Sequence, residues 1–173
     1  MNKTVIYLDT SIIGFFENPE PEFEKNEENY ELNIRRKKTQ EFIKIVKDNP
    51  DQYLLVASPL IVMEQERAPE GLKENLEQRL NEIDPFFFPK HPQVNLLHME
   101  YRNACLLPYP KCKEDLLHIA YAVYYECDII VSWNFKHFVN ENTIRSLKKI
   151  NQKLDVLTPD IISPSTFIER FKQ

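Results

Sequence analysis

The chain has 173 residues, an apolar fraction of 42% and a net charge of −5 at neutral pH. This size and composition predict a single domain over residues 1–173 with a sizeable core, and the acidic balance argues against broad, nonspecific binding of polyanions. No apolar run approaches the roughly 18–20 residues of a membrane-spanning helix, and the first run is too short for a signal peptide, so we expect a cytoplasmic protein without membrane contact.

Three short apolar runs, each followed by a polar residue, predict buried strands. They are residues 5–8, 54–57 and 129–131, which are followed by Asp9, Ser58 and Ser132. Runs this short, and apolar on both faces, are typical of parallel strands covered by helices on either side. A fourth strand is expected at 155–157.

Longer segments between these runs have the apolar spacing of amphipathic helices. The clearest stripe lies within 113–126, where Leu116, Ala120 and Val123 recur on one face. The other expected helices are 31–47, 58–66, 71–83, 93–104 and 140–151. Strands that alternate with helices predict an α/β fold with a mainly parallel sheet.

Glycine and cysteine usage excludes several kinds of site. The two glycines, Gly14 and Gly71, cannot build the phosphate-binding loop of a Rossmann or P-loop protein. The cysteines, Cys105, Cys112 and Cys127, are odd in number and lack Cys-x-x-Cys spacing. This pattern suggests neither a disulfide framework nor a zinc site, so we expect reduced thiols.

Residues 17–31 contain seven glutamates and one lysine, and four basic residues follow at 35–38. The usual interpretation of such charge runs is an acidic loop that leads into the solvated face of a helix. The alternative interpretation makes the basic run a phosphate contact and the acidic loop a cover or a partner site. The sequence leaves both interpretations open.

Three acidic residues fall where a parallel sheet places functional side chains. Asp9 follows the first strand, and ligands of open α/β sheets bind beyond the carboxyl ends of the strands. Ser58 and Pro59 have the pattern of a helix start, and Glu64 is long enough to lean back along that helix toward the strand ends. Asp115 lies in the first turn of another helix, where a negative charge is favoured. We expect the three carboxylates to converge on one pole of the sheet.

Converging carboxylates repel one another unless a cation neutralises them. Oxygen ligands favour Mg²⁺ or Mn²⁺ over zinc, and such an ion can activate a water molecule for attack on a phosphodiester. Taken singly, each acid has an ordinary explanation: Asp9 as a helix cap, Glu64 as a surface residue, and Asp115 as a partner of the helix dipole. The joint arrangement favours a metal site.

Four segments, which together span nearly the whole chain, occur in the order of one known family. They are residues 7–11 (YLDTS), 58–64 (SPLIVME), 115–120 (DLLHIA) and 130–138 (IVSWNFKHF). On these segments the chain resembles PIN-domain proteins, the ribonuclease fold of many toxins of the VapC kind. The resemblance implies a three-layer α/β/α sandwich with a central, mainly parallel sheet, and metal-dependent RNA hydrolysis with ligands at Asp9, Glu64 and Asp115.

One position departs from the pattern of the family. The fourth acidic position is Asn134 here, two residues after Ser132. An asparagine can still coordinate a metal or hold a metal-bound water, but it brings no charge. We therefore expect Asn134 to assist the three carboxylates and a second metal ion to bind more weakly.

Several neighbours of the acids are candidates for supporting or substrate-binding roles. Those expected to position the site or cap a helix are Thr10, Ser11 and Ser132. His118 could contact the site or be a satisfied helix histidine, and the candidates for RNA phosphate contact are Lys136, His137 and Arg145. Trp133 is expected to pack, with base stacking as the alternative. The run 86–88 is expected in the core or at a dimer seam.

Taken together, the sequence predicts an endoribonuclease that uses Mg²⁺ or Mn²⁺, with RNA as substrate, an antitoxin protein as a candidate partner and a homodimer as a candidate assembly. The competing class is a PIN-fold module that binds RNA or a protein without turnover. A phosphatase of the haloacid-dehalogenase kind needs a second aspartate two residues after Asp9, where Ser11 stands.

Overall fold

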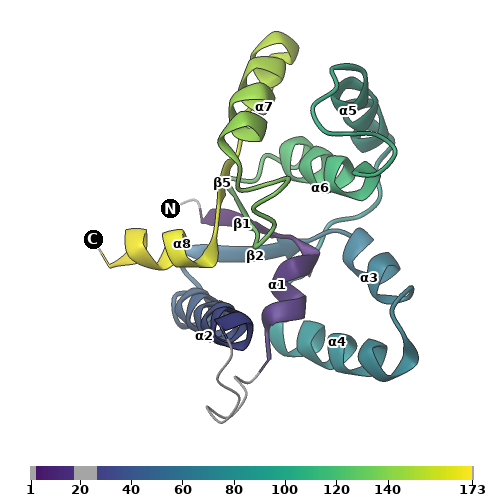
Figure 1. The fold of residues 1–173 in the computed structure, drawn as a ribbon. Helices are drawn as coiled ribbons and strands as arrows, with labels where there is room; N and C mark the ends of the chain where they lie inside the picture. Colours follow the sequence, from purple (N-terminus) through teal and green to yellow (C-terminus); the bar gives the residue numbers. More distant parts are fainter. Residues whose placement is uncertain (1–2, 18–26, 173) are drawn as a thin grey trace.

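A five-stranded parallel sheet runs through the centre of the computed structural model, which describes residues 3–17 and 27–172 (Figure 1). The strand order is β3-β2-β1-β4-β5, so the first strand of the chain lies in the middle of the sheet. The strands are β1 (Thr4–Leu8), β2 (Tyr53–Ala57), β3 (Phe86–Phe87), β4 (Ile129–Val131) and β5 (Asp160–Ile162).

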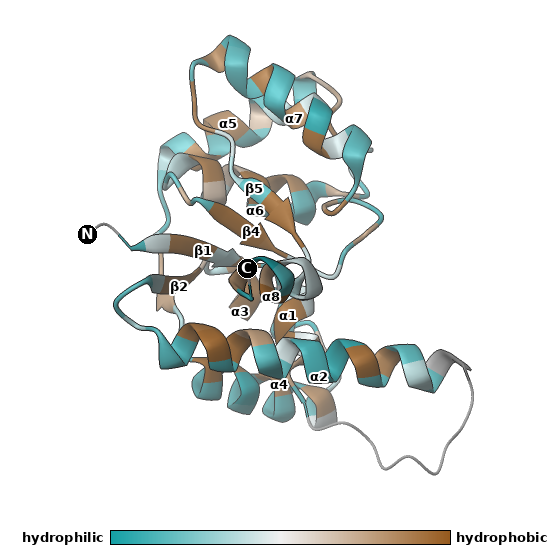
Figure 2. Cartoon of the chain, turned by 90° about the vertical axis from the view of Figure 1, so that its left-hand side faces the viewer, coloured by the Kyte–Doolittle hydropathy of each residue, from teal (hydrophilic) through white to brown (hydrophobic). Residues whose placement is uncertain are grey.

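Helices cover both faces of the sheet, which confirms the predicted three-layer α/β/α sandwich. One face packs against α5 (Pro92–Asn103), α6 (Lys113–Tyr124) and α7 (Glu141–Leu154). The other face packs against α1 (Thr10–Phe15), α2 (Glu27–Asp48), α4 (Glu70–Ile83) and α8 (Pro164–Phe171), and the short α3 (Leu60–Gln65) follows β2. Figure 2 shows α5, α6 and α7 on one side of the strands and α2 and α4 on the other.

Successive residues of the central strand pack into different cores because side chains alternate across a strand. Tyr7 belongs to the cluster under α5, α6 and α7, whereas Ile6 and Leu8 belong to the cluster under α2 and α4. All three side chains are fully buried. Burial on both faces explains why the strands read as continuous apolar runs in the sequence.

The last strand lies further along the chain than its predicted position. Residues 155–157 were expected to form it, and this prediction is wrong: Asp155 ends α7 in a left-handed conformation, and Leu157 is exposed. The strand is β5, which pairs with β4 through Ile130 and Ile161.

Of the three phenylalanines at 86–88, the first two lie at the edge of the sheet, and Phe88 is half-buried and packs against the core. Phe86 and Phe87 form β3 and are exposed, so the predicted core placement is wrong for both. Phe88 stacks on Tyr125 with ring centroids 4.0 Å apart. A dimer seam at this edge stays a prediction.

The acidic segment predicted at 17–31 is described only at its two ends. Residues 18–26 lie outside the described part of the chain, and α2 begins at Glu27, so the end of the segment is helical rather than a loop. Glu17 forms ion pairs with Arg36 and Arg79. Within the described residues, no helix combines the length and apolarity that crossing a membrane requires.

Candidate metal centre

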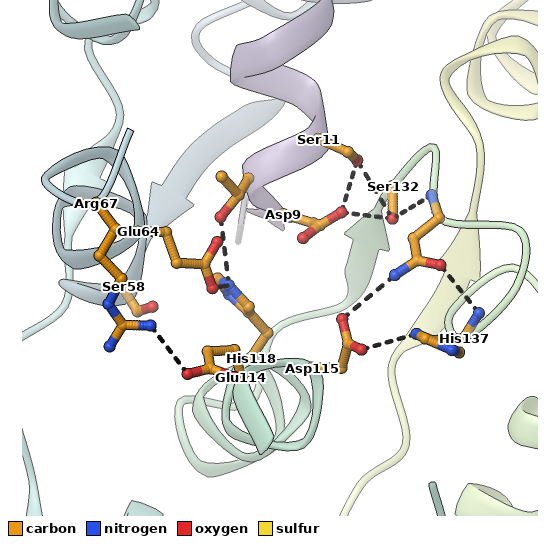
Figure 3. A network of polar contacts seen from close by, with 12 residues as sticks. Asp9, Ser11, Ser58, Glu64, Arg67, Glu114, Asp115, His118, Ser132 and His137 are labelled. Carbon is orange, nitrogen blue, oxygen red and sulfur yellow. Dashed lines mark hydrogen bonds and ion pairs between the residues drawn. The ribbon is translucent and has the colours of Figure 1, made fainter. Parts of the chain in front are cut away.

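Asp9 lies directly after β1, and two serine hydroxyls hold its carboxylate. The pairing of Leu8 with Val131 places the ends of β1 and β4 side by side, so Asp9 lies next to Ser132. Ser132 Oγ and Ser11 Oγ each donate to Asp9 Oδ2 over 2.6 Å (Figure 3). The buried carboxylate is therefore fixed in one orientation.

The same serines tie the loop after β4 to the start of α1. Ser11 Oγ accepts a hydrogen bond from the backbone N–H of Trp133 over 2.9 Å, and Ser132 Oγ accepts one from the N–H of Asn134 over 2.9 Å. Asp9 occupies the N-cap position of α1, but its side chain makes no capping hydrogen bond. Ser11 thus holds Asp9 as predicted, and both serines position the loop that carries Asn134.

The Glu64 carboxylate contacts His118, a buried histidine of α6 that lies in the candidate site. The Oε1 atom of Glu64 lies 3.2 Å from Nε2 of His118, whose Nδ1 lies 2.7 Å from the Tyr7 hydroxyl. Tyr7 donates its own proton to Ser58 Oγ over 2.7 Å, so its oxygen is left to accept from Nδ1. Both ring nitrogens of His118 therefore face oxygen atoms, an arrangement that suits the protonated form of the ring.

The pKa values of both partners agree with this ion pair. Burial lowers the pKa of His118, but the hydrogen bond to Glu64 and the charges of Asp9, Glu64 and Asp115 outweigh it, so the pKa is raised. Burial also raises the pKa of Glu64, and His118 outweighs that effect and lowers it. Each group therefore favours the charged form of the other.

Asp115 is held by two residues of the loop after β4. Its Oδ2 atom lies 2.8 Å from Nδ1 of His137, and its Oδ1 atom accepts from Nδ2 of Asn134 over 3.2 Å. Burial raises the pKa of Asp115, and Asp9 raises it further, although His137 opposes both effects. The two aspartates therefore repel each other, and a cation would relieve this repulsion.

Asn134 positions its neighbours in the structure. Its amide nitrogen donates to Asp115, and its Oδ1 atom accepts from the backbone N–H of His137 over 3.0 Å. The oxygen that was expected to bind a metal is engaged by the backbone. Metal coordination by Asn134 stays a prediction.

The three carboxylates lie around His118 but do not form a closed set of ligands. Figure 3 shows Asp9, Glu64 and Asp115 coming from three different elements and turned inward. In residues 3–17 and 27–172, the group of three metal-ligating side chains with all ligand atoms within 4.8 Å of one another is Cys112, Asp115 and His137. The three carboxylates suit Mg²⁺ or Mn²⁺ by donor type, and binding would require them to turn toward one another.

Comparison with known proteins supports the fold. No family model matches the chain, and no curated protein matches it significantly in sequence. The fold is similar to a chain in the crystal structure of VapBC2 from Rickettsia felis bound to a DNA fragment from their promoter, with a TM-score of 0.54 and 14% sequence identity. The match covers 92% of this chain and 98% of that chain, so it spans the whole sandwich.

The fold is PIN/VapC-like. At this low identity the likeness concerns the fold alone, and the roles of the site residues rest on the geometry of this chain.

Sequence reasoning missed three contributors to the site. Ser58 was expected to cap α3, but that helix has no side-chain cap, and Ser58 instead accepts from Tyr7. Cys112 was expected to be an ordinary thiol, and it lies against His137. The signal for Cys112 was its spacing, three residues before Asp115 at the start of a helix. Arg67 pairs with Glu114 over 3.1 Å at the rim of the site.

The predicted phosphate contacts differ in how exposed they are. Lys136 and Arg145 are exposed, whereas His137 is turned toward Asp115. Three side chains of the basic run at 35–38 form ion pairs with glutamates. The pairs are Arg35 with Glu31, Arg36 with Glu17, and Lys38 with Glu41. The run is thus largely neutralised within the chain.

The only tryptophan packs inside the protein, as predicted. Trp133 is buried, and its Nε1 atom donates to Thr39 Oγ1 over 2.7 Å. The guanidinium of Arg35 lies 5.8 Å from the Trp133 ring and 5.5 Å from the ring of exposed Phe135. Phe135 is thus the exposed aromatic side chain beside Asn134.

Proposed function

We propose that this protein is a metal-dependent endoribonuclease, with Asp9, Glu64 and Asp115 as ligands for Mg²⁺ or Mn²⁺. The observation that supports this most directly is the gathering of the three acids around one buried histidine at the carboxyl edge of a parallel sheet. Ligands of open α/β sheets bind at this edge.

Neighbouring side chains orient the three carboxylates of the proposed site. Ser11 and Ser132 hold Asp9, and Asn134 and His137 hold Asp115, so two ligands are oriented before an ion arrives. His118 keeps Glu64 ionised. Thr10 Oγ1 lies 3.4 Å from His118 Nε2 and completes the polar surroundings of that nitrogen. When bound, a divalent ion activates water and neutralises the charge that develops in phosphodiester cleavage.

The proposal extends to partners and cellular context. The similar fold in VapBC2 belongs to a complex bound to promoter DNA. By analogy, we propose RNA as the substrate, an antitoxin protein as the partner, a cytoplasmic location and a homodimer as the assembly. A short gene for a DNA-binding antitoxin beside this one would support the toxin assignment.

The test is RNA cleavage with Mg²⁺ or Mn²⁺, compared with the same reaction in a chelator. The variants Asp9→Asn, Glu64→Gln and Asp115→Asn should each lose most cleavage and still fold. Glu114→Gln is the matched control, because Glu114 neighbours Asp115 but pairs with Arg67 at the rim. The assignment of an acid fails if its variant keeps near wild-type turnover at saturating metal.

A non-catalytic PIN-fold module remains the second candidate, and a specific observation favours it. Asn134 replaces an acid with a neutral side chain whose oxygen already accepts from the backbone of His137. Fewer charges hold a metal less tightly. RNA binding by the wild-type protein, without cleavage in either metal, would favour this function over the nuclease.

A further inference from the structure

Cys112, Asp115 and His137 form a compact group beside the three carboxylates. Cys112 Sγ lies 3.7 Å from Nδ1 and 3.6 Å from Nε2 of His137, and Asp115 Oδ2 lies 2.8 Å from Nδ1 of the same ring. Cys112 is the N-cap residue of α6, Asp115 lies in the first turn of that helix, and His137 lies in the loop after β4. Two elements therefore bring a thiol, a carboxylate and an imidazole to one point.

The spacing of these atoms suits a tetrahedral metal ion. Bond lengths of about 2.0–2.3 Å to sulfur, nitrogen and oxygen place neighbouring ligand atoms roughly 3.4–3.6 Å apart. The sulfur–nitrogen distances already match this spacing. The hydrogen bond between Asp115 and His137 would need to open by about half an ångström, which side-chain rotation provides.

The same three residue types occur in catalytic triads, but this arrangement does not suit a nucleophile. Cys112 Sγ is almost equidistant from both nitrogens of His137, so neither nitrogen lies in line to take its proton. Cys112 is also 1% exposed, which prevents a large substrate from reaching the sulfur. His137 and Asp115 retain about a fifth of their side-chain exposure, so a small ion can enter from their side.

We propose that Cys112 Sγ, the Asp115 carboxylate and the His137 ring bind a thiophilic divalent cation such as Zn²⁺, with one coordination position left for water. The thiol proton is released to solvent when the sulfur–metal bond forms. Asn134 donates to the second oxygen of Asp115 and accepts from the backbone of His137, so it holds both ligands in place. Thiolate and imidazole select zinc over magnesium.

The two candidate metal sites share Asp115, so they compete for one carboxylate. A zinc ion at Cys112 and His137 would draw Asp115 away from Asp9 and Glu64. Zinc should then inhibit cleavage supported by magnesium, and Cys112→Ser should relieve this inhibition. This consequence rests on the proposed nuclease function, whereas the zinc site itself does not.

The test uses Co²⁺ as a spectroscopic probe for zinc. Tetrahedral cobalt bound to a thiolate gives a charge-transfer absorption band in the near ultraviolet. Added zinc should displace the cobalt ion, and the band should then disappear. The wild-type protein, reduced with a phosphine, should give this band at one equivalent of cobalt. Cys112→Ser should lose the band, and His137→Gln should weaken cobalt binding by more than roughly tenfold.

Cys105→Ser is the matched control, because Cys105 is the exposed thiol and lies outside the group. This variant should keep the band. Circular dichroism checks the fold of each variant. If Cys112→Ser fails to fold, His137→Gln still tests the site, because it leaves the buried sulfur in place. Absence of the band in the wild-type protein, or its loss in Cys105→Ser, would overturn the proposal.

The nuclease assay separates this proposal from the proposed function. A cobalt band in a protein that cleaves no RNA would support the zinc site and contradict the nuclease. Cleavage that depends on magnesium in a protein without the band would do the reverse.

Discussion

His118 is buried among three acidic residues; burial lowers its pKa, but the hydrogen bond to Glu64 and the charges of Asp9, Glu64 and Asp115 raise it. In its protonated form the ring would compensate part of the negative charge of these acids. Glu64 is the carboxylate that contacts the His118 ring directly. Asp9 and Asp115 are held by other side chains: Ser132 donates to Asp9, and His137 contacts Asp115. At this scale the site is a set of individually positioned side chains.

The ion pair between His118 and Glu64 predicts a pH-dependent stability. The pKa of His118 is raised above its usual 6.5, so its contribution is present below that pH and is lost as pH rises through the folded pKa. The pKa of Glu64 is lowered from its usual 4.5, so its contribution is lost as pH falls through the folded pKa. In chelator, His118→Gln should therefore lower the free energy of unfolding by about 2–3 kcal/mol near pH 5.5 and by less above pH 8.

His98→Gln supplies a control with the opposite sign. His98 is buried, and burial lowers its pKa, so the wild-type residue destabilises the protein as pH falls. Urea titrations of both variants across this pH range measure the two trends. A deficit in His118→Gln that does not vary with pH would mean that His118 is neutral in the folded protein.

The contact between Asn134 and Asp115 predicts how a substitution at position 134 changes stability and metal binding. Asn134→Asp replaces the donor to Asp115 with a second negative charge 3.2 Å from its Oδ1 atom. In chelator the variant should melt several degrees below the wild type, because like charges at this distance repel. Mg²⁺ should restore the melting temperature and bind more tightly than to the wild type.

Asn134→Ala is the comparison for this variant, since it removes the same hydrogen bond without adding a charge. Calorimetric titration with Mg²⁺ measures the affinity. Equal stoichiometry and affinity in Asn134→Asp and wild type would place residue 134 outside the metal site.

Among the secondary-structure elements, the sequence predicts those with a clear apolar pattern. The strands β1, β2 and β4 lie close to their predicted positions because each falls in an apolar run that ends at a polar residue, and the helices α2 and α4 to α7 do so because each is long enough to show the helical period. The strands β3 and β5 gave no such signal: β3 has two residues, both exposed, and β5 has one exposed and two buried residues.

The candidate site follows the same logic. Acids at strand ends and in a first helical turn could be placed because each position has a local rule. The contact between Cys112 and His137 could not, because it depends on how α6 packs against the loop after β4. The role of Ser58 was missed because its partner, Tyr7, is 51 residues away.

The end of α7 gives a prediction for an element. Asp155 adopts φ 55°, a left-handed conformation that glycine accepts without strain. Asp155 is exposed, so Asp155→Gly should raise the free energy of unfolding by about 0.5–1 kcal/mol. Lys153→Gly, within the same helix, should lower it by about 1 kcal/mol. The urea midpoints of the two variants should therefore shift in opposite directions; a loss of stability in Asp155→Gly would contradict the argument.

For the whole molecule, the net charge of −5 means that the proposed RNA substrate would approach through local positive charge. The basic run of α2 is the densest such feature in the sequence, but its ion pairs to Glu17, Glu31 and Glu41 neutralise much of it. Lys136 is exposed in the loop that carries Asn134 and His137. We therefore expect Lys136 to contribute more to RNA binding than the run does.

This expectation is tested in an Asp9→Asn background, which separates binding from cleavage. Lys136→Gln should weaken RNA binding and reduce the slope of log affinity against log salt by about 0.7, the value for one phosphate contact on a single strand. Neutralising Arg35, Arg36, Lys37 and Lys38 together should chiefly lower stability. A larger change of slope in the fourfold variant would place the RNA path on α2. Metal affinity should stay the same in both variants.

The central position of β1 has a consequence for when the candidate site can assemble during synthesis. The first strand pairs with β4, and Asp9 receives its hydrogen bond from Ser132, 123 residues later in the chain. A nascent chain that has not yet released Ser132 from the ribosome holds Asp9 without this partner and without the loop that orients Asp115. The site therefore cannot assemble until synthesis has passed Ser132 and the loop that follows it, because its contacts join distant parts of the chain.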